Sequence, residues 1–300
     1  MWRRLKHWCY SLAVIGMTFG IRHSPRRLAL SIGAALGAVA FWVSKREKAR
    51  ACDNIRNSLG VNNPHAVKRL ARKTFENLGK NVVEFVQFPH MSPTMLRQYV
   101  VFEGKEHIER ALTAGKGAIM LTGHFGNWEL LAASIVANGY TLHPIVRRLR
   151  SSRLESVVRS YRQKAGYIGI DREKSLRRAL LCLKRNELLG ILADVDTKVN
   201  GVFVEFFGRP AYTPYSPVAI ALKTGSPILP TFIIRQPDDS HRVVVEPPMA
   251  LERSGERHRD MIVNTQKFTR IIESYIQRYP SQWVWMHDRW KTQPCDDCEM

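Results

Sequence analysis

The chain has 300 residues, which is enough for one globular body with a sizeable core and an appendage, and short for two full domains. Its 45% hydrophobic content is typical of a globular protein. With 46 Lys and Arg against 26 Asp and Glu, the formal net charge is +20, so we expect a partner with dense negative charge. Nucleic acid, anionic lipid headgroups and an acidic carrier protein all meet that description.

The first fifty residues contain two apolar stretches, 8–21 and 28–43, with basic residues before, between and after them. Each is shorter than the roughly 20 residues of an upright membrane-spanning helix. A signal peptide is disfavoured by the second stretch and by the lack of a clear cleavage site. We interpret 1–50 as a retained membrane anchor, either one marginal span or two helices in the cytoplasmic leaflet. A pair of buried core helices is the alternative.

Residues 51–300 are predicted to form one domain of alternating helices and short apolar strands. Asn-Asn-Pro at 62–64 supplies an N-cap and a proline for a helix that continues to about 85. Strands are predicted at 99–103, 117–122, 142–146, 188–193, 227–234 and 242–246. Further helices are predicted at 105–114, 128–138, 153–165, 173–186, 214–224 and 256–278. This alternation indicates an α/β fold with a mostly parallel central sheet flanked by helices.

One junction between a predicted strand and a predicted helix carries two ionisable residues, His124 and Glu129, in the segment MLTGHFGNWEL. Gly126 permits a tight turn and Asn127 is a suitable N-cap, so Glu129 is expected in the first helical turn. From there its carboxylate could reach back to one ring nitrogen, fix the tautomer and leave the other nitrogen as a general base. The alternative is a loop histidine beside a glutamate that only complements the helix dipole.

Neither a nucleophile nor a metal set accompanies this pair. The segment has no cysteine and no G-x-S-x-G motif, so the attacking group is expected to be a hydroxyl of the substrate. Zinc would need three or four ligands, and no His or Cys cluster lies nearby. Of the five cysteines, Cys295 and Cys298 have the spacing of a redox or metal half-site, but without a second pair we interpret them as a plain tail.

Several segments taken together resemble one protein family. They are EGKEHIERALTAGKGAIMLTGHFGNWEL, VRRLRSSRLESVVRSYRQKAG, GILAD, VEFFGRPAYTPYSPVAIALKTGSPILPTFIIR and PSQWVWMHDRWKTQP. In this order they resemble the bacterial lipid A late acyltransferases, the lauroyl and myristoyl transferases, a branch of the lysophospholipid acyltransferase superfamily with an H-x4-D/E signature. The resemblance covers nearly the whole chain.

The resemblance implies roles for particular residues. It makes His124 the general base, Glu129 its orienting carboxylate, and Arg147 a cation near the reaction centre that neutralises an oxyanion or grips a phosphate. The alternative for Arg147 is a surface basic cluster. Substrate-binding roles are implied for Asn127, Asp194 and Arg209. Val195 stands where the family usually has glutamine, so this chain departs from the family pattern at that polar contact.

The resemblance also implies the reaction and its partners. A fatty acyl chain would pass from a thioester on acyl carrier protein to a hydroxyl of a lipid A precursor in the inner leaflet, without a metal or redox cofactor and without nucleic acid. The enzyme would sit on the bacterial inner membrane with its catalytic domain on the cytoplasmic face. Two alternatives are acylation of another lipid hydroxyl, on a lysophospholipid, aminolipid or glycolipid, and a non-catalytic basic protein that binds anionic membrane or RNA.

Overall fold

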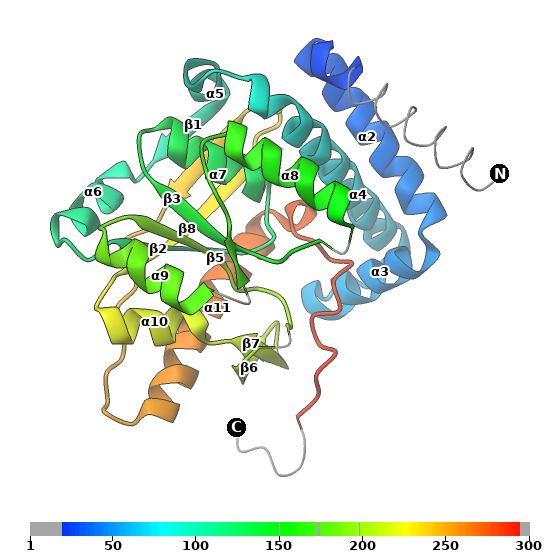
Figure 1. The fold of residues 1–300 in the computed structure, drawn as a ribbon. Coiled ribbons are helices and arrows are strands. Elements are labelled where there is room, and N and C mark those ends of the chain that lie inside the picture. Colours follow the sequence, from blue (N-terminus) through cyan, green and yellow to red (C-terminus); the bar gives the residue numbers. More distant parts are fainter. Residues whose placement is uncertain (1–19, 150, 173–174, 198, 295–300) are drawn as a thin grey trace.

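The predicted parallel sheet is present and forms the centre of the molecule. A computed structural model describes residues 20–149, 151–172, 175–197 and 199–294, and these form a seven-stranded sheet in the order β1-β9-β8-β2-β5-β3-β4 (Figure 1). Its strands are β1 (Val100–Glu103), β2 (Ala118–Thr122), β3 (Leu142–Val146), β4 (Ile170–Asp171), β5 (Leu188–Leu192), β8 (Ile228–Arg235) and β9 (His241–Val245). The run from β8 to β4 is parallel. Because β9 pairs antiparallel with β8, β9 and its parallel neighbour β1 run in the opposite direction.

Helices cover both faces of this sheet. One face packs against α5 (Pro93–Tyr99), α6 (Lys105–Thr113) and α7 (Trp128–Ala137), and the other against α9 (Ser175–Lys184), α10 (Ser216–Thr224) and α11 (Arg257–Arg278). Along β2, Ile119 and Leu121 belong to the second core while Ala118 and Met120 belong to the first. Because both faces are covered, the central strands read as continuous apolar runs.

Three N-terminal helices pack beside the sheet: α2 (Arg26–Val43), α3 (Lys45–Leu59) and α4 (Pro64–Gln87), which begins at the predicted Asn-Asn-Pro cap (Figure 1). Glycines let the backbones of α2 and α4 touch. A Cβ added at Gly37 would lie 2.2 Å from the carbonyl oxygen of Phe75, and one at Gly79 would lie 2.0 Å from that of Gly33. The two helices therefore pack more closely than side chains would allow.

The opposite face of α2 is apolar and exposed. It carries Leu28, Leu36, Val39, Trp42 and Val43. At 18 residues, with a mean hydropathy of 1.4 and 28% of its residues buried, α2 is long and apolar enough to cross a membrane by length and composition. The first predicted apolar stretch falls almost wholly in 1–19, outside the described residues. The division into 1–50 and 51–300 stays a prediction, and α2 itself packs on a helix of the second part.

A valine at Gly37 is expected to loosen this helix pair. Its side chain would collide with the backbone of α4, and such overpacking costs about 1–3 kcal/mol of the free energy of unfolding. The matched control is Ala35→Val, which adds a similar side chain on the exposed side of α2. Chemical unfolding of the full chain in detergent micelles measures both. Equal stability of the two variants would contradict the close packing.

The remaining elements of the described chain are a two-stranded hairpin, β6 (Gly201–Phe206) with β7 (Arg209–Pro214), the helix α8 (Ser152–Lys164), and two short 3-10 helices, η1 (Phe88–His90) and η3 (Pro280–Gln282). The hairpin packs against α11 near the C-terminal end of the described chain (Figure 1). Helix α8 has no buried residue. It links β3 to β4 and therefore begins at the carboxyl edge of the sheet, after the end of β3.

Candidate active site

The site is built on two neighbouring parallel strands, β2 and β5. Their register pairs Thr122 with Leu192, so His124 and Asp194 each follow their strand at the same distance. Carboxyl ends of parallel strands meet at one edge of a sheet, where ligands of open α/β proteins bind. The connection that follows β2 leads to β3 on one side, and the connection that follows β5 leads to β8 on the other. The edge between β2 and β5 is therefore a topological switch point.

Three hydrogen bonds fix the carboxylate of Asp194, two with His124 and one with Trp283. Its Oδ1 lies 2.8 Å from Nδ1 of His124, while its Oδ2 accepts the backbone N–H of His124 at 2.7 Å and the indole N–H of Trp283 at 2.8 Å. Burial alone would raise the pKa of Asp194, but the charge and hydrogen bonds of His124 and the Trp283 hydrogen bond lower it to about 2. Asp194 is therefore an anion at neutral pH.

An ionised Asp194 sets the tautomer of the imidazole. Because a carboxylate only accepts, Nδ1 of His124 carries the hydrogen and donates it, which leaves the lone pair on Nε2. The His124 ring also contacts the rings of Trp128 and His287, with centroids 5.1 and 5.3 Å away. Its side chain is 25% exposed and lines a cavity, whereas that of Asp194 is fully buried. This arrangement suits a general base facing a bound substrate.

The cavity next to His124 has a volume of about 750 Å³, in the range of sites for small molecules. Much of its wall is apolar, including Trp128, Ile145, Val146, Leu176, Ile191 and Ile220. Charged residues also line it, among them Arg147, Glu129 and Lys291. An amphiphilic molecule fits such a lining, with its apolar part against the wall and its polar part near the histidine.

The predicted contact between Glu129 and His124 is not the one the structure forms. Glu129 lies in the first turn of α7, as predicted, but its carboxylate forms a two-point ion pair with Arg162 and accepts the hydroxyl of Tyr167 at 2.7 Å. Burial and the charge of Glu129 raise the pKa of Tyr167. The imidazole turns toward β5 because it precedes the helix, while Glu129 faces α8. A catalytic role for Glu129 stays a prediction.

The loop that carries His124 is fixed from several sides. Gly126 has φ +58°, and a Cβ there would lie 2.0 Å from the carbonyl oxygen of Ile233, so only glycine fits. Its carbonyl accepts the Asn81 amide at 2.6 Å. Asn127 caps α7 as predicted, accepting the N–H of Leu130, and its amide donates to buried Glu84 at 2.8 Å. With both polar ends used inside the protein, Asn127 lies behind the described cavity wall; substrate binding by it stays a prediction.

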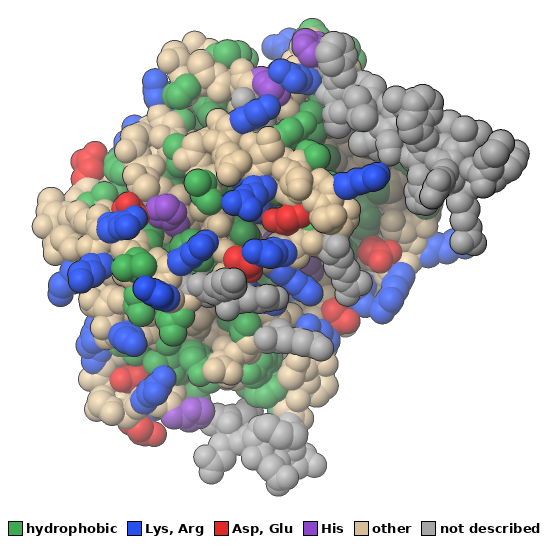
Figure 2. Space-filling view, in the orientation of Figure 1, with side chains coloured by type: hydrophobic (Ala, Val, Ile, Leu, Met, Phe, Trp, Pro, Cys, Tyr) green, Lys and Arg blue, Asp and Glu red, His purple; other side chains and the backbone are tan. Residues whose placement is uncertain are grey.

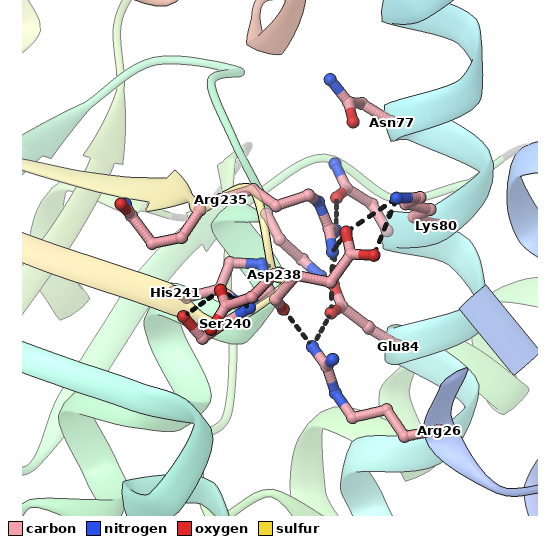
Figure 3. Close-up of polar contacts among 12 residues, drawn as sticks. Arg26, Asn77, Lys80, Glu84, Arg235, Asp238, Ser240 and His241 are labelled. Carbon is pink, nitrogen blue, oxygen red and sulfur yellow. Dashed lines mark hydrogen bonds and ion pairs between the residues drawn. The ribbon is translucent and has the colours of Figure 1, made fainter. Parts of the chain in front are cut away.

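Glu84 is the centre of a buried charge network behind this loop (Figure 3). Arg235 donates two hydrogen bonds to its carboxylate, at 2.6 and 3.0 Å, and Arg26 of α2 donates one at 2.6 Å. Burial would raise the pKa of Glu84, but the positive groups around it lower that pKa to about 2. Nε2 of His241 lies 3.6 Å away, and burial lowers the pKa of His241 to about 4. The network joins α2, α4 and β8 to the His124 loop.

Of the other predicted site residues, Arg147 lines the cavity and Arg209 does not. Arg147 is exposed and lines the cavity, as its predicted place near the reaction centre requires. Arg209 lies on β7 with its guanidinium 4.0 Å from the centre of the Trp290 ring, and burial lowers its pKa. It is not among the residues that line this cavity. A catalytic role for Arg147 and substrate binding by Asp194 or Arg209 stay predictions.

The C-terminal segment closes the site, a role that was not predicted from the sequence. Trp283 holds Asp194, and His287 and Lys291 line the cavity. Burial and the charge of His124 lower the pKa of His287. Asn54 of α3 donates to the carbonyls of Trp285 and His287, which fixes the segment. The density of aromatic and ionisable residues in WVWMHDRW was the available signal.

Among the described residues, one group could offer three metal ligands: His143, Cys182 and Glu187, with ligand atoms within 4.8 Å of one another. His143 and Glu187 already pair at 3.0 Å, and the Cys182 thiol donates to the carbonyl of Leu188. Burial and Glu187 raise the pKa of Cys182 to about 12, which opposes the thiolate form that binds metals. We assign this group no metal. Cys295 and Cys298 lie outside the described residues.

Fold and site together define an α/β enzyme with a histidine–carboxylate pair and an amphiphilic substrate cavity. A profile of the family described as bacterial lipid A biosynthesis acyltransferase matches residues 2–292 of the chain. The chain belongs to this family of acyltransferases. The resemblance seen in the sequence motifs is thereby confirmed.

Three individual relatives are 24–29% identical to the chain. The chain is 29% identical over 184 residues to a phosphatidylinositol mannoside acyltransferase of Mycobacterium tuberculosis, which covers 59% of this chain and 58% of the relative. It is 24% identical over 272 residues to the lipid A biosynthesis palmitoleoyltransferase of Escherichia coli, covering 90% and 87%. It is also 24% identical to the lipid A biosynthesis lauroyltransferase of Escherichia coli, covering 93% and 90%.

Proposed function

We propose that the protein transfers a fatty acyl chain from a thioester on acyl carrier protein to a hydroxyl of a lipid A precursor at the inner membrane. The observation that carries the proposal is the His124–Asp194 pair at the wall of a partly apolar cavity, in a chain of this family. The acyl chain lies against the apolar wall, and the reacting hydroxyl lies at Nε2 of His124.

In this mechanism His124 removes the proton of the acceptor hydroxyl as the oxygen attacks the thioester carbonyl. The imidazolium that forms is stabilised by Asp194, which holds Nδ1–H throughout. Collapse of the tetrahedral intermediate breaks the carbon–sulfur bond, and the departing thiolate takes the proton from Nε2. General base catalysis of this kind contributes about 10²–10⁴-fold to the rate. Glu129 acts by positioning Arg162 and Tyr167 at the same cavity.

The charge of the surface and the apolar face of α2 suit binding to acidic partners and to a membrane. Figure 2 shows many Lys and Arg side chains and few acidic ones on the face that carries α8 and α9. Exposed members on these helices are Arg153, Arg159, Lys164, Arg177, Arg178 and Lys184. Such a field attracts an acidic carrier protein and anionic lipid headgroups. We place the apolar face of α2 in the cytoplasmic side of the bilayer, which brings the enzyme to its acceptor.

A second candidate acceptor is a mannosylated phospholipid or another glycolipid. It is favoured by the relative of highest identity among those given above, which is named as a phosphatidylinositol mannoside acyltransferase. The same histidine chemistry serves either acceptor, because only the molecule that carries the hydroxyl changes.

Mass spectrometry of envelope lipids tests the proposal. Cells without the gene are expected to show one lipid that is lighter by one acyl chain, and the lipid that changes identifies the acceptor. The wild-type gene restores the mass, whereas His124→Ala is expected to restore less than about 1% because the base is lost. His258→Ala is the matched control, since His258 is exposed on α11 far along the chain. An unchanged lipid profile in the deletion, or full restoration by His124→Ala, would contradict the proposal.

A further inference from the structure

Helix α8 carries an apolar side that the described part of the chain leaves exposed. None of its residues is buried, and Leu154 and Val157 are 53% and 48% exposed. These two residues are three positions apart and Tyr161 follows four positions later, so the three side chains lie on one side of the helix. A row of exposed apolar side chains with polar residues around it is typical of a surface that binds another protein or a membrane.

This side of α8 continues the apolar surface of α2 and α4. The Tyr161 ring lies 5.6 Å from the Phe85 ring of α4, and Tyr161 also packs against a cluster that contains Ala29 of α2 and Val83 of α4. Val82 of α4 is 64% exposed and lies one turn from Phe85. Figure 1 shows α4 between α8 and α2. The exposed apolar side chains of the three helices are therefore neighbours.

The charges of α8 suit an anionic partner. Arg153, Arg159 and Lys164 are exposed, and Glu155, the one acidic residue of the helix, accepts the backbone N–H of Leu149 at 2.8 Å. An apolar helix face with cations around it binds in the interface of a bilayer that contains anionic lipids. An acidic protein also matches the cations, but the continuity with the apolar face of α2 favours lipid.

We infer that α8 is a second helix that contacts the membrane, an inference that rests on the proposed placement of α2 in the bilayer. Leu154 and Val157 enter the apolar side of the interface. Arg153 and Lys164 are eleven residues apart, which is about three helical turns, so both lie at the same edge of the apolar side and meet the headgroups.

This contact places the cavity at the bilayer surface. Helix α8 begins at the carboxyl edge of the sheet, and its Arg162 binds Glu129 in the cavity wall. A lipid held beside α8 can therefore present its hydroxyl to His124 while its acyl chains stay in the membrane. Helix α2 alone fixes one side of the protein to the bilayer, and α8 sets the tilt that turns the cavity toward the acceptor.

Photo-crosslinking tests the contact without any acyl transfer. We expect full-length Val157→p-benzoylphenylalanine to form lipid adducts, detected by mass spectrometry, after irradiation in vesicles of phosphatidylethanolamine and phosphatidylglycerol. Gln163→p-benzoylphenylalanine is the matched control, because Gln163 is exposed on the opposite side of α8, and it should give at most about a tenth of these adducts. Equal adducts at both positions, none at Val157, or a Val157 adduct with added acyl carrier protein in place of lipid overturns the inference. Failure of the acyl-transfer proposal would leave this result untouched.

Steady-state kinetics show whether the contact serves the reaction. Val157→Asp is expected to raise KM for an acceptor lipid in the same vesicles about tenfold, because a carboxylate is repelled from an anionic interface. It should leave KM for a water-soluble short-chain acceptor unchanged, which also shows that the variant folds. Gln163→Asp adds the same charge on the opposite side and is expected to change neither value. Equal KM values for the vesicle acceptor in both variants, or a rise confined to the acyl carrier protein thioester, would overturn the membrane contact.

Discussion

Replacing Asp194 with asparagine is expected to lower kcat about 10³- to 10⁴-fold, although the two side chains have nearly the same shape. Oδ2 of Asp194 accepts two N–H groups, from the backbone of His124 and from Trp283. The asparagine oxygen must take that place, because its NH2 group cannot accept. The NH2 then faces Nδ1 of His124 and forces the hydrogen onto Nε2, so the base has no lone pair for the substrate.

The tautomer itself can be measured. Nitrogen-15 NMR of ring-labelled histidine is expected to show the Nδ1–H form for His124 in the wild type and the Nε2–H form in Asp194→Asn. The comparison variant is Glu129→Gln, for which we expect the Nδ1–H form to persist because Glu129 binds Arg162 and Tyr167. A changed tautomer in Glu129→Gln with an unchanged one in Asp194→Asn would return the orienting role to Glu129.

The site around His124 was predictable from the sequence only in part. The position of His124 before the helix, the cap at Asn127 and the helical place of Glu129 were all predictable from local signals. The partner was not, because the order of strands in the sheet decides it. Chain order suggests β3 as the neighbour of β2, whereas β5 lies between them and brings Asp194 to the imidazole from 70 residues away. Both residues come just after predicted strands, 117–122 and 188–193, and this shared position was the signal that the sequence offered for their pairing.

The fold was also predictable from the sequence only in part. Long apolar runs such as 117–122 became strands within one or two residues of their predicted bounds, since two helical layers demand continuous apolar side chains. Three short strands were not predicted. In the hairpin of β6 and β7, β6 alternates buried residues with partly exposed ones while β7 does not, and the turn at Phe207 and Gly208 has positive φ at both positions. Strand β4 has two residues, too few for any periodicity.

Neutralising Glu84 is expected to cost about 3–5 kcal/mol of the free energy of unfolding, the largest effect on stability that we predict. The carboxylate is 3% exposed and binds Arg235, which is 5% exposed, so Glu84→Gln removes the closer counter-ion of a buried guanidinium and leaves it only the Asp239 carboxylate at 3.4 Å. On the same helix, Glu76→Gln breaks a surface pair with Arg72 and should cost at most about 0.5 kcal/mol. Urea unfolding of both variants in micelles measures the difference, and equal losses would contradict a stabilising network.

The same network makes the wild type sensitive to acid. His241 has a pKa of about 4 in the folded protein against 6.5 in an open chain, so the unfolded state binds the extra proton first and stability falls as the pH drops from about 6.5 toward 4. The pKa of Glu84 falls from 4.5 to about 2, which adds a second loss from about pH 4.5 downward. His241→Gln is expected to remove the upper part of this decline and leave the lower part. A decline that His241→Gln leaves unchanged above pH 5 would show that another group carries it.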